Sequence, residues 1–112
     1  MMKRETCVDG LSIEMLARMG EVLRVLAHRH RLKIVEILEG SKGLPVHTIS
    51  EQLELPHAAT SQHLNHMRRV GILSAQRNGK EVNYAIADER SLSILKCIRS
   101  KASGGSIQGN DK

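Results

Sequence analysis

The sequence predicts a mainly α fold with one small β-hairpin, in the order helix, helix, helix, helix, strand, strand, helix. Apolar residues recur at helical spacing in four segments before Gly71. Two short extended runs follow, with Asn78-Gly79 between them, and helical spacing returns after Asp88. At 112 residues the chain is long enough for a single small domain.

The first two helices are predicted from their apolar stripes. In the first helix one stripe is formed by Leu16, Met19, Leu23 and Leu26, and it is widened by Met15 and Val22. A helix that is apolar on two sides needs two packing partners. In the second helix the stripe is formed by Leu32, Val35 and Leu38, and Gly40 is suited to the left-handed C-terminal cap. The segment SKGLP is then expected to be a loop.

The third and fourth helices are predicted to form a helix-turn-helix. Val46, Ile49 and Leu53 give the third helix one apolar stripe, and the turn follows at Glu54 to Pro56. Proline restricts the residue before it and suits the first turn of a new helix, so a second helix of the motif begins at Pro56.

A two-stranded wing and a last helix complete the predicted domain. The strands cover Ile72 to Arg77 and Glu81 to Ala87, and Asp88 can cap the last helix. The stripe of that helix is formed by Leu92, Leu95 and Ile98. We expect a flexible N-terminal arm at 1–10, the domain at 11–101 and a disordered tail at 102–112.

The helix after Pro56 carries an outward face without acidic residues. Thr60, Leu64 and Met67 cluster on its inner side, and no Asp or Glu occurs between Leu55 and Lys80. The outward positions are Ala58, Ser61, Gln62, Asn65 and Arg69, with His57 and Arg68 at the margin. A phosphate backbone is a natural neighbour for such a face.

Composition limits the functional classes. The net charge of +5 and the pI near 9.6 favour an anionic partner, which by charge alone could be DNA, RNA or an acidic protein. Without Trp or Phe the core is aliphatic and thin, so we expect a homodimer. Two cysteines do not make a secreted disulfide framework, so we expect a cytoplasmic protein. No signal peptide, membrane span or catalytic constellation is recognisable, and an enzyme is not expected.

The segments VLAHRHRLKIVEIL, TSQHLNHMRRVGIL and NGKEVNYAIAD, in this order of elements, resemble the ArsR/SmtB family of bacterial winged helix-turn-helix repressors. The resemblance covers Leu16 to Ile98. It implies a homodimer joined through its first and last helices, bound to palindromic operator DNA and released when a chemical signal binds.

On this interpretation each outward residue has a role in DNA binding. Gln62 and Asn65 pair with adenine edges, Ser61 serves a base or a phosphate, and Ala58 touches a thymine methyl group. Phosphate contacts are expected from His57, Arg68 and Arg69, and at the hairpin tip from Arg77 and Lys80. His63 lies nearer the packed side, where a structural role is favoured over base contact.

The family's known signal sites are incomplete in this chain. Its metal site on the third helix needs cysteines, where this sequence has Pro45, Val46, His47 and Thr48. Its zinc site on the last helix falls on Asp88, Glu89, Ser100 and Lys101, and its persulfide cysteines fall at Glu36 and beyond Ala102. We therefore expect no resident metal or cofactor, and the identity of any metal or metalloid inducer stays open.

Two groups of residues remain as candidate sensors. Cys7 and Cys97 could approach each other if the terminal helices pack together, although Cys97 as a buried small hydrophobe and Cys7 as an idle thiol are the alternatives. His28 and His30 open the second helix, and Cys7 with His47 could bind a metal across a dimer. His63 and His66 are spaced so that they could chelate a metal, but the alternative is that they face DNA or solvent.

The rival function is a winged helix that contacts protein or RNA and does not read the sequence of a DNA duplex.

Overall fold

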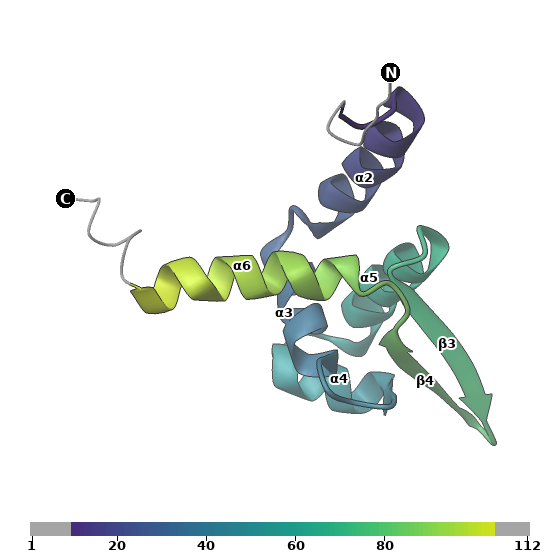
Figure 1. Cartoon of the computed structure of the whole chain (residues 1–112). Helices are drawn as coiled ribbons and strands as arrows, with labels where there is room; N and C mark the ends of the chain where they lie inside the picture. Colours follow the sequence, from purple (N-terminus) through teal and green to yellow (C-terminus); the bar gives the residue numbers. More distant parts are fainter. Residues whose placement is uncertain (1–9, 105–112) are drawn as a thin grey trace.

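The structure is a computed structural model that describes residues 10–104. Its helices are α2 (Ile13–Leu26), α3 (Arg29–Leu38), α4 (Val46–Leu53), α5 (His57–Arg69) and α6 (Arg90–Gly104). Its strands are β2 (Leu44–Pro45), β3 (Leu73–Asn78) and β4 (Glu81–Ile86). The predicted order of helices and hairpin is confirmed (Figure 1). Within the described residues, no helix has the length and apolar character needed to cross a membrane.

The predicted fold needs three corrections in its details. Leu44–Pro45, expected in a loop, forms β2, which pairs with β4, so the sheet has three strands in the order β2-β4-β3. The hairpin loop is Gly79–Lys80, because Asn78 pairs with Glu81. Gly79 has φ +68° and is the only loop residue with positive φ, which fits a type II′ turn. Finally, α6 continues to Gly104, past the start of the tail expected at 102–112; residues 105–112 of that tail, and residues 1–9 of the expected arm, lie outside the described residues.

The core lies between α3, α4, α5 and the sheet, and it is aliphatic as predicted except for Tyr84, which is also buried in it. Ile34, Val35, Leu38, Ile49 and Leu64 are all completely buried. Leu95 of α6 is buried in this core, and Arg99 of α6 forms exposed ion pairs with Glu36 and Glu39, with the shorter nitrogen–oxygen distance 2.8 Å. The Asp88 carboxylate accepts from the Arg90 backbone N–H at 3.0 Å, as expected of a cap.

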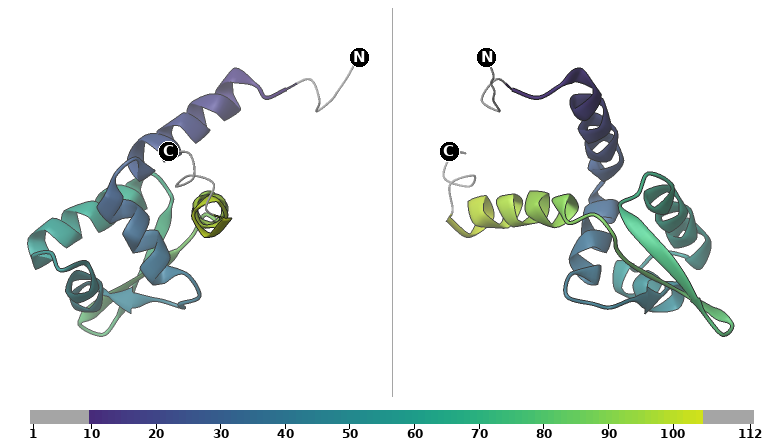
Figure 2. Two further views of the ribbon diagram at one scale, coloured as in Figure 1. Left: turned by 90° about the vertical axis from the view of Figure 1, so that its left-hand side faces the viewer. Right: turned by 45° about the vertical axis from the view of Figure 1, so that its right-hand side comes forward.

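The helix α2 and the outer part of α6 project from this core (Figures 1 and 2). The Cα radius of gyration is 16.7 Å, whereas a compact domain of this size has about 13 Å. Only Val22, Val25 and Leu26 of α2 are buried, and they lie near its C-terminal end. The predicted stripe of α2 is therefore only partly packed within this chain, because Leu16 and Leu23 remain 47% and 50% exposed.

Candidate nucleic-acid interface

The helix-turn-helix is built around one unusual backbone position. Glu54 ends α4 in the left-handed conformation, with φ 59° and ψ 43°, and Pro56 then caps α5. The Leu55 backbone N–H donates to the Ser50 carbonyl at 3.2 Å, and the Thr60 N–H donates to the Pro56 carbonyl at 3.0 Å. These contacts close the turn within three residues and fix the direction of α5 relative to α4.

One face of α5 is anchored in the core. Thr60, Leu64 and Met67 have no exposed area, as the helical spacing predicted. The Thr60 hydroxyl donates to the Pro56 carbonyl at 3.1 Å, so its polar atom is satisfied in this buried setting. Burial of this face fixes the rotation of α5 about its own axis, and this in turn fixes which residues of α5 face outward.

The opposite face presents the predicted contact residues. Ser61 is half-buried, and the other positions of this set are exposed: His57, Ala58, Gln62, Asn65, Arg68 and Arg69. Within the part of the chain that the structure describes, neither Gln62 nor Asn65 hydrogen-bonds to another side chain, so their amide groups are free for a ligand. Gln62 and Asn65 line a shallow hollow together with Arg31, His63, His66 and Arg69.

A second hollow lies between the starts of α4 and α5 and the hairpin. It brings His57 and Lys80, far apart in sequence, onto one surface with Val46, Val82 and Tyr84. Both α4 and α5 begin at this hollow, so their N-terminal ends add partial positive charge beside it. His47 also lines the hollow, where its ring lies 3.6 Å from the Glu81 carboxylate.

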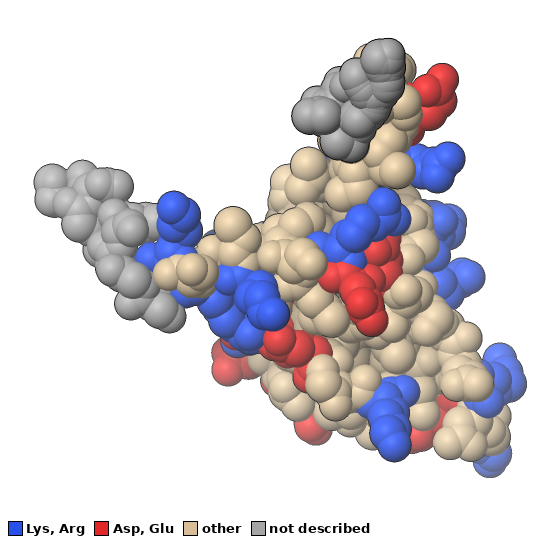
Figure 3. Space-filling model, viewed as in Figure 1, with Lys and Arg blue, Asp and Glu red and all other residues tan. Residues whose placement is uncertain are grey.

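Basic side chains follow the edge of the molecule that contains α5 and the hairpin. Figure 3 shows Lys and Arg along its right-hand edge down to the hairpin tip. Arg77 in β3 and Lys80 in the loop are both exposed. Of the predicted phosphate contacts, His57 and Lys80 share one surface, whereas Arg77 lines neither hollow.

His63 has the structural role that its position favoured. Its Nδ1 accepts a hydrogen bond from the Arg31 Nε at 3.1 Å, and the Arg31 Nη1 donates to the Val25 carbonyl at 3.2 Å. Arg31 therefore joins the end of α2 and the start of α3 to α5. Burial is the main reason why the pKa of His63 lies below its usual value, and the charges of His28 and Arg31 lower it further. Sequence reasoning missed this link because no local pattern relates residues 32 positions apart.

The candidate sensing residues have different outcomes. Cys97 is an exposed thiol on α6, so its interpretation as a buried hydrophobe is wrong for this chain alone. Cys7 lies outside the described residues, so the structure does not test whether the two thiols approach each other. His47 lies on α4 beside Glu81 rather than with His28 and His30. Those two instead face His63, a grouping that the sequence did not predict.

Comparisons with known proteins also identify a helix-turn-helix in this chain and relate it to transcriptional repressors. A family model described as a helix-turn-helix domain matches residues 26–74. The chain is 37% identical to the HTH-type transcriptional repressor SmtB of Mycobacterium tuberculosis over 82 residues, or 73% of this chain and 60% of that protein. It is 40% identical to the transcriptional repressor PagR of Bacillus anthracis over 79 residues, or 70% of this chain and 79% of that protein. The chain thus spans less than two thirds of SmtB.

Solved structures agree with the fold. The crystal structure of PagR superposes with a TM-score of 0.71 at 37% identity, covering 78% of this chain and 99% of PagR. HlyU of Vibrio cholerae superposes with a TM-score of 0.73 at 26% identity, covering 80% of this chain and 96% of HlyU. The sequence identity to repressors, the matched helix-turn-helix and the shared fold lead to one conclusion: this chain belongs to the ArsR/SmtB family of winged helix-turn-helix regulators.

Proposed function

We propose that this protein is a sequence-specific repressor that binds double-stranded operator DNA as a homodimer in the cytoplasm. The observation that carries the proposal is the exposed, acid-free face of α5, whose opposite face is locked into the core by Thr60, Leu64 and Met67. A helix held this rigidly can present Gln62 and Asn65 to base edges in the major groove without first becoming ordered.

Phosphate contacts would come from the surface beside that face. His57 and Lys80 share a hollow with the N-terminal ends of two helices, and Arg77 extends along the hairpin. Arg68 and Arg69 lie at the other end of α5. Such contacts supply affinity that is independent of sequence and decreases with salt, while Gln62 and Asn65 supply sequence preference.

The dimer would use the apolar surface that this chain leaves uncovered. Among the described residues, the exposed large apolar side chains are Leu11, Ile13, Met15, Leu16 and Leu23 at or near α2, and Ile98 on α6. Helices that project with apolar side chains in water are typical of interaction surfaces. Pairing these helices between two copies would place two α5 helices on one duplex.

The test is selection of preferred sequences from random DNA duplexes, followed by affinity measurements at several salt concentrations. Gln62→Ala and Asn65→Ala should each weaken binding to the selected duplex by about 1–3 kcal/mol per contact and reduce sequence preference. Lys80→Ala should weaken binding to all duplexes by a similar factor and make the salt dependence of binding shallower. Gln52→Ala, on the exposed side of α4, is the matched control and should leave sequence preference unchanged.

The rival function makes the opposite prediction. If the wild-type protein selects no sequence, or binds single-stranded RNA as tightly as its best duplex, the face of α5 serves a different partner. If Gln62→Ala and Lys80→Ala each lower the affinity for every duplex by the same factor, Gln62 does not contribute to sequence preference. Our separation of base contacts from phosphate contacts is then wrong.

Release from DNA by a thiol signal is our proposal for regulation. Cys97 is exposed on α6, next in sequence to Ile98 on the apolar surface proposed for dimer contact, so oxidation there would alter how two copies pair. We expect diamide or arsenite to weaken operator binding of the wild type and not of Cys97→Ser. Equal loss of binding by both proteins would exclude Cys97 as the sensor.

A further inference from the structure

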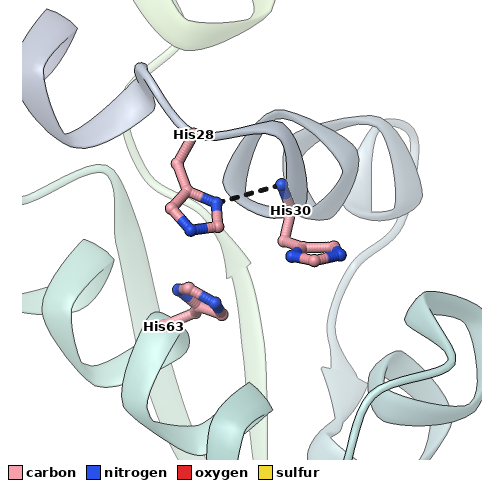
Figure 4. A group of neighbouring side chains, drawn as sticks. All are labelled: His28, His30 and His63. Carbon is pink, nitrogen blue, oxygen red and sulfur yellow. Dashed lines mark hydrogen bonds between the residues drawn. The ribbon is translucent and has the colours of Figure 1, made fainter.

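Three imidazole rings meet where α2, α3 and α5 come together (Figure 4). His28 precedes α3, His30 lies in its first turn, and His63 lies on α5. One nitrogen from each ring lies within 4.8 Å of the others. The ring centroids of His28 and His63 are 4.6 Å apart, and those of His28 and His30 are 5.5 Å apart. Two separate segments of the chain therefore converge on one small volume.

We propose that His28, His30 and His63 form a binding site for a divalent first-row transition metal, of the zinc, nickel and copper class. Imidazole nitrogen is a preferred ligand of these ions, whereas magnesium and calcium prefer oxygen ligands. Three protein nitrogens leave at least one coordination position for water. The proposal concerns the free protein, so it stands independently of DNA binding.

The separation of the rings suits such an ion after small side-chain rotations. Nitrogens at about 2.0–2.1 Å from a tetrahedral zinc ion lie roughly 3.3 Å from one another. The backbones that carry the rings are already held in place by core packing, because Leu64 beside His63 and Ile34, one turn after His30, are completely buried. Metal binding would therefore require movement of side chains and not of helices.

The rings are also suited to bind a metal near neutral pH, since only an unprotonated nitrogen is a ligand. Burial is the leading cause of a lowered pKa for both His28 and His63, and Arg31 lowers both further. No acidic residue is among the causes, so burial and the neighbouring positive charges both favour the unprotonated form of His28 and His63, in which a nitrogen lone pair is available.

Two hydrogen bonds compete with the metal. The Nδ1 of His28 accepts from the His30 backbone N–H at 3.2 Å, and the Nδ1 of His63 accepts from the Arg31 Nε at 3.1 Å. With Nδ1 accepting, each neutral ring has its proton on Nε2. Coordination either takes the Nδ1 lone pair or moves the proton to Nδ1, and both routes displace these donors. Both donors are only partly buried, so water can replace the lost bonds.

Arg31 sets the expected strength of the site. Its positive charge lies beside His63 and opposes any cation there. Three neutral imidazoles with an adjacent guanidinium should therefore bind zinc more weakly than sites with cysteine thiolates. Metal binding should also free the Arg31 guanidinium from His63, which places a mobile charge in the hollow lined by Gln62 and Asn65.

The experiment is titration of the untagged full chain, in a Cys7→Ser/Cys97→Ser background, with zinc chloride against a chromophoric chelator. Cobalt chloride absorption in the visible range reports whether nitrogen ligands surround the ion. We expect one equivalent per chain, and His30→Gln and His63→Gln should each weaken affinity at least about tenfold. The side chain of His30 has no hydrogen bond in the described structure, so its replacement tests the ligand with the least risk to folding.

The control is His47→Gln, which removes an exposed imidazole outside the cluster. It should leave zinc affinity unchanged, and thermal unfolding in EDTA should show that all variants are folded. Failure of the wild type to bind one equivalent would overturn the proposal. So would a loss of affinity in His47→Gln equal to that in His63→Gln, because binding would then reflect surface histidines in general.

Discussion

Truncation of two leucines on α2 tests whether this helix is a dimer surface. Leu16 and Leu23 are seven residues apart, and therefore lie on one face of the helix with 47% and 50% of their surface exposed. The double variant Leu16→Ala/Leu23→Ala removes that surface while keeping residues of high helix propensity. The fold of each chain should therefore persist.

The size of the effect follows from these exposures. Complete burial of a leucine side chain contributes about 1.5–3 kcal/mol, and about half of each side chain remains to be covered, which leaves about 1 kcal/mol per leucine. A symmetric dimer contains four such side chains, so the variant should lose about 4 kcal/mol of association free energy. This corresponds to a roughly thousandfold weaker dimer.

Sedimentation equilibrium measures this change directly. The wild type should be dimeric at micromolar concentration, and the double variant should be largely monomeric there. Arg18→Ala is the control, because Arg18 is also exposed on α2 but contributes little apolar surface. A monomeric wild type, or a double variant that dimerises as tightly as the wild type, would refute this use of α2.

Two further predictions concern stability. Glu54→Gly should stabilise the protein by about 0.5–1 kcal/mol in urea unfolding, because glycine adopts the left-handed conformation without the cost of about 1–2 kcal/mol that a side chain incurs; Glu54→Ala should give no such gain. Burial lowers the pKa of His63 in the folded state, so the unfolded chain binds this proton more readily, and stability measured in EDTA should decrease as the pH falls below about 6.5. His63→Gln should show a weaker pH dependence, and an unchanged dependence would contradict the assigned cause.

Helices could be predicted because their apolar spacing is local. Ile49, Leu53, Leu64 and Met67 are buried where the periodicity placed them. The same reasoning was incomplete for α2, since an apolar stripe indicates that something covers it without saying whether the cover is the same chain. Leu16 and Leu23 are exposed within one chain for that reason.

The short strand β2 has no sequence signal. Two residues are too few for an alternating pattern, and Pro45 is unfavourable inside a sheet. Pairing is possible because β2 is an edge strand beside β4, with Leu44 opposite Tyr84. Gly43 precedes it with φ +149°, and a side chain there would approach Asn83. The strand therefore depends on a tertiary contact with residues 40 positions away.

The histidine cluster could not be predicted either, because His63 is far from His28 and His30 in the sequence. His28 and His30 were visible as a pair, and His63 was visible as a neighbour of the outward face of α5. The three rings come together only in the folded chain, where Arg31 of α3 donates a hydrogen bond to His63 of α5. The residues of the candidate DNA face were predictable because one helix contains most of them, whereas a site shared between segments was not.

In α5 the buried residues and the residues proposed for recognition alternate along one short helix. Each step turns the side chain by about 100°, so Leu64 is completely buried while its neighbour Asn65 is exposed. Substitution at Asn65 or Gln62 can therefore change what the helix contacts and leave its packing intact. Because the proposed readout positions contribute little to the core, substitutions there can alter the preferred DNA sequence without altering the fold.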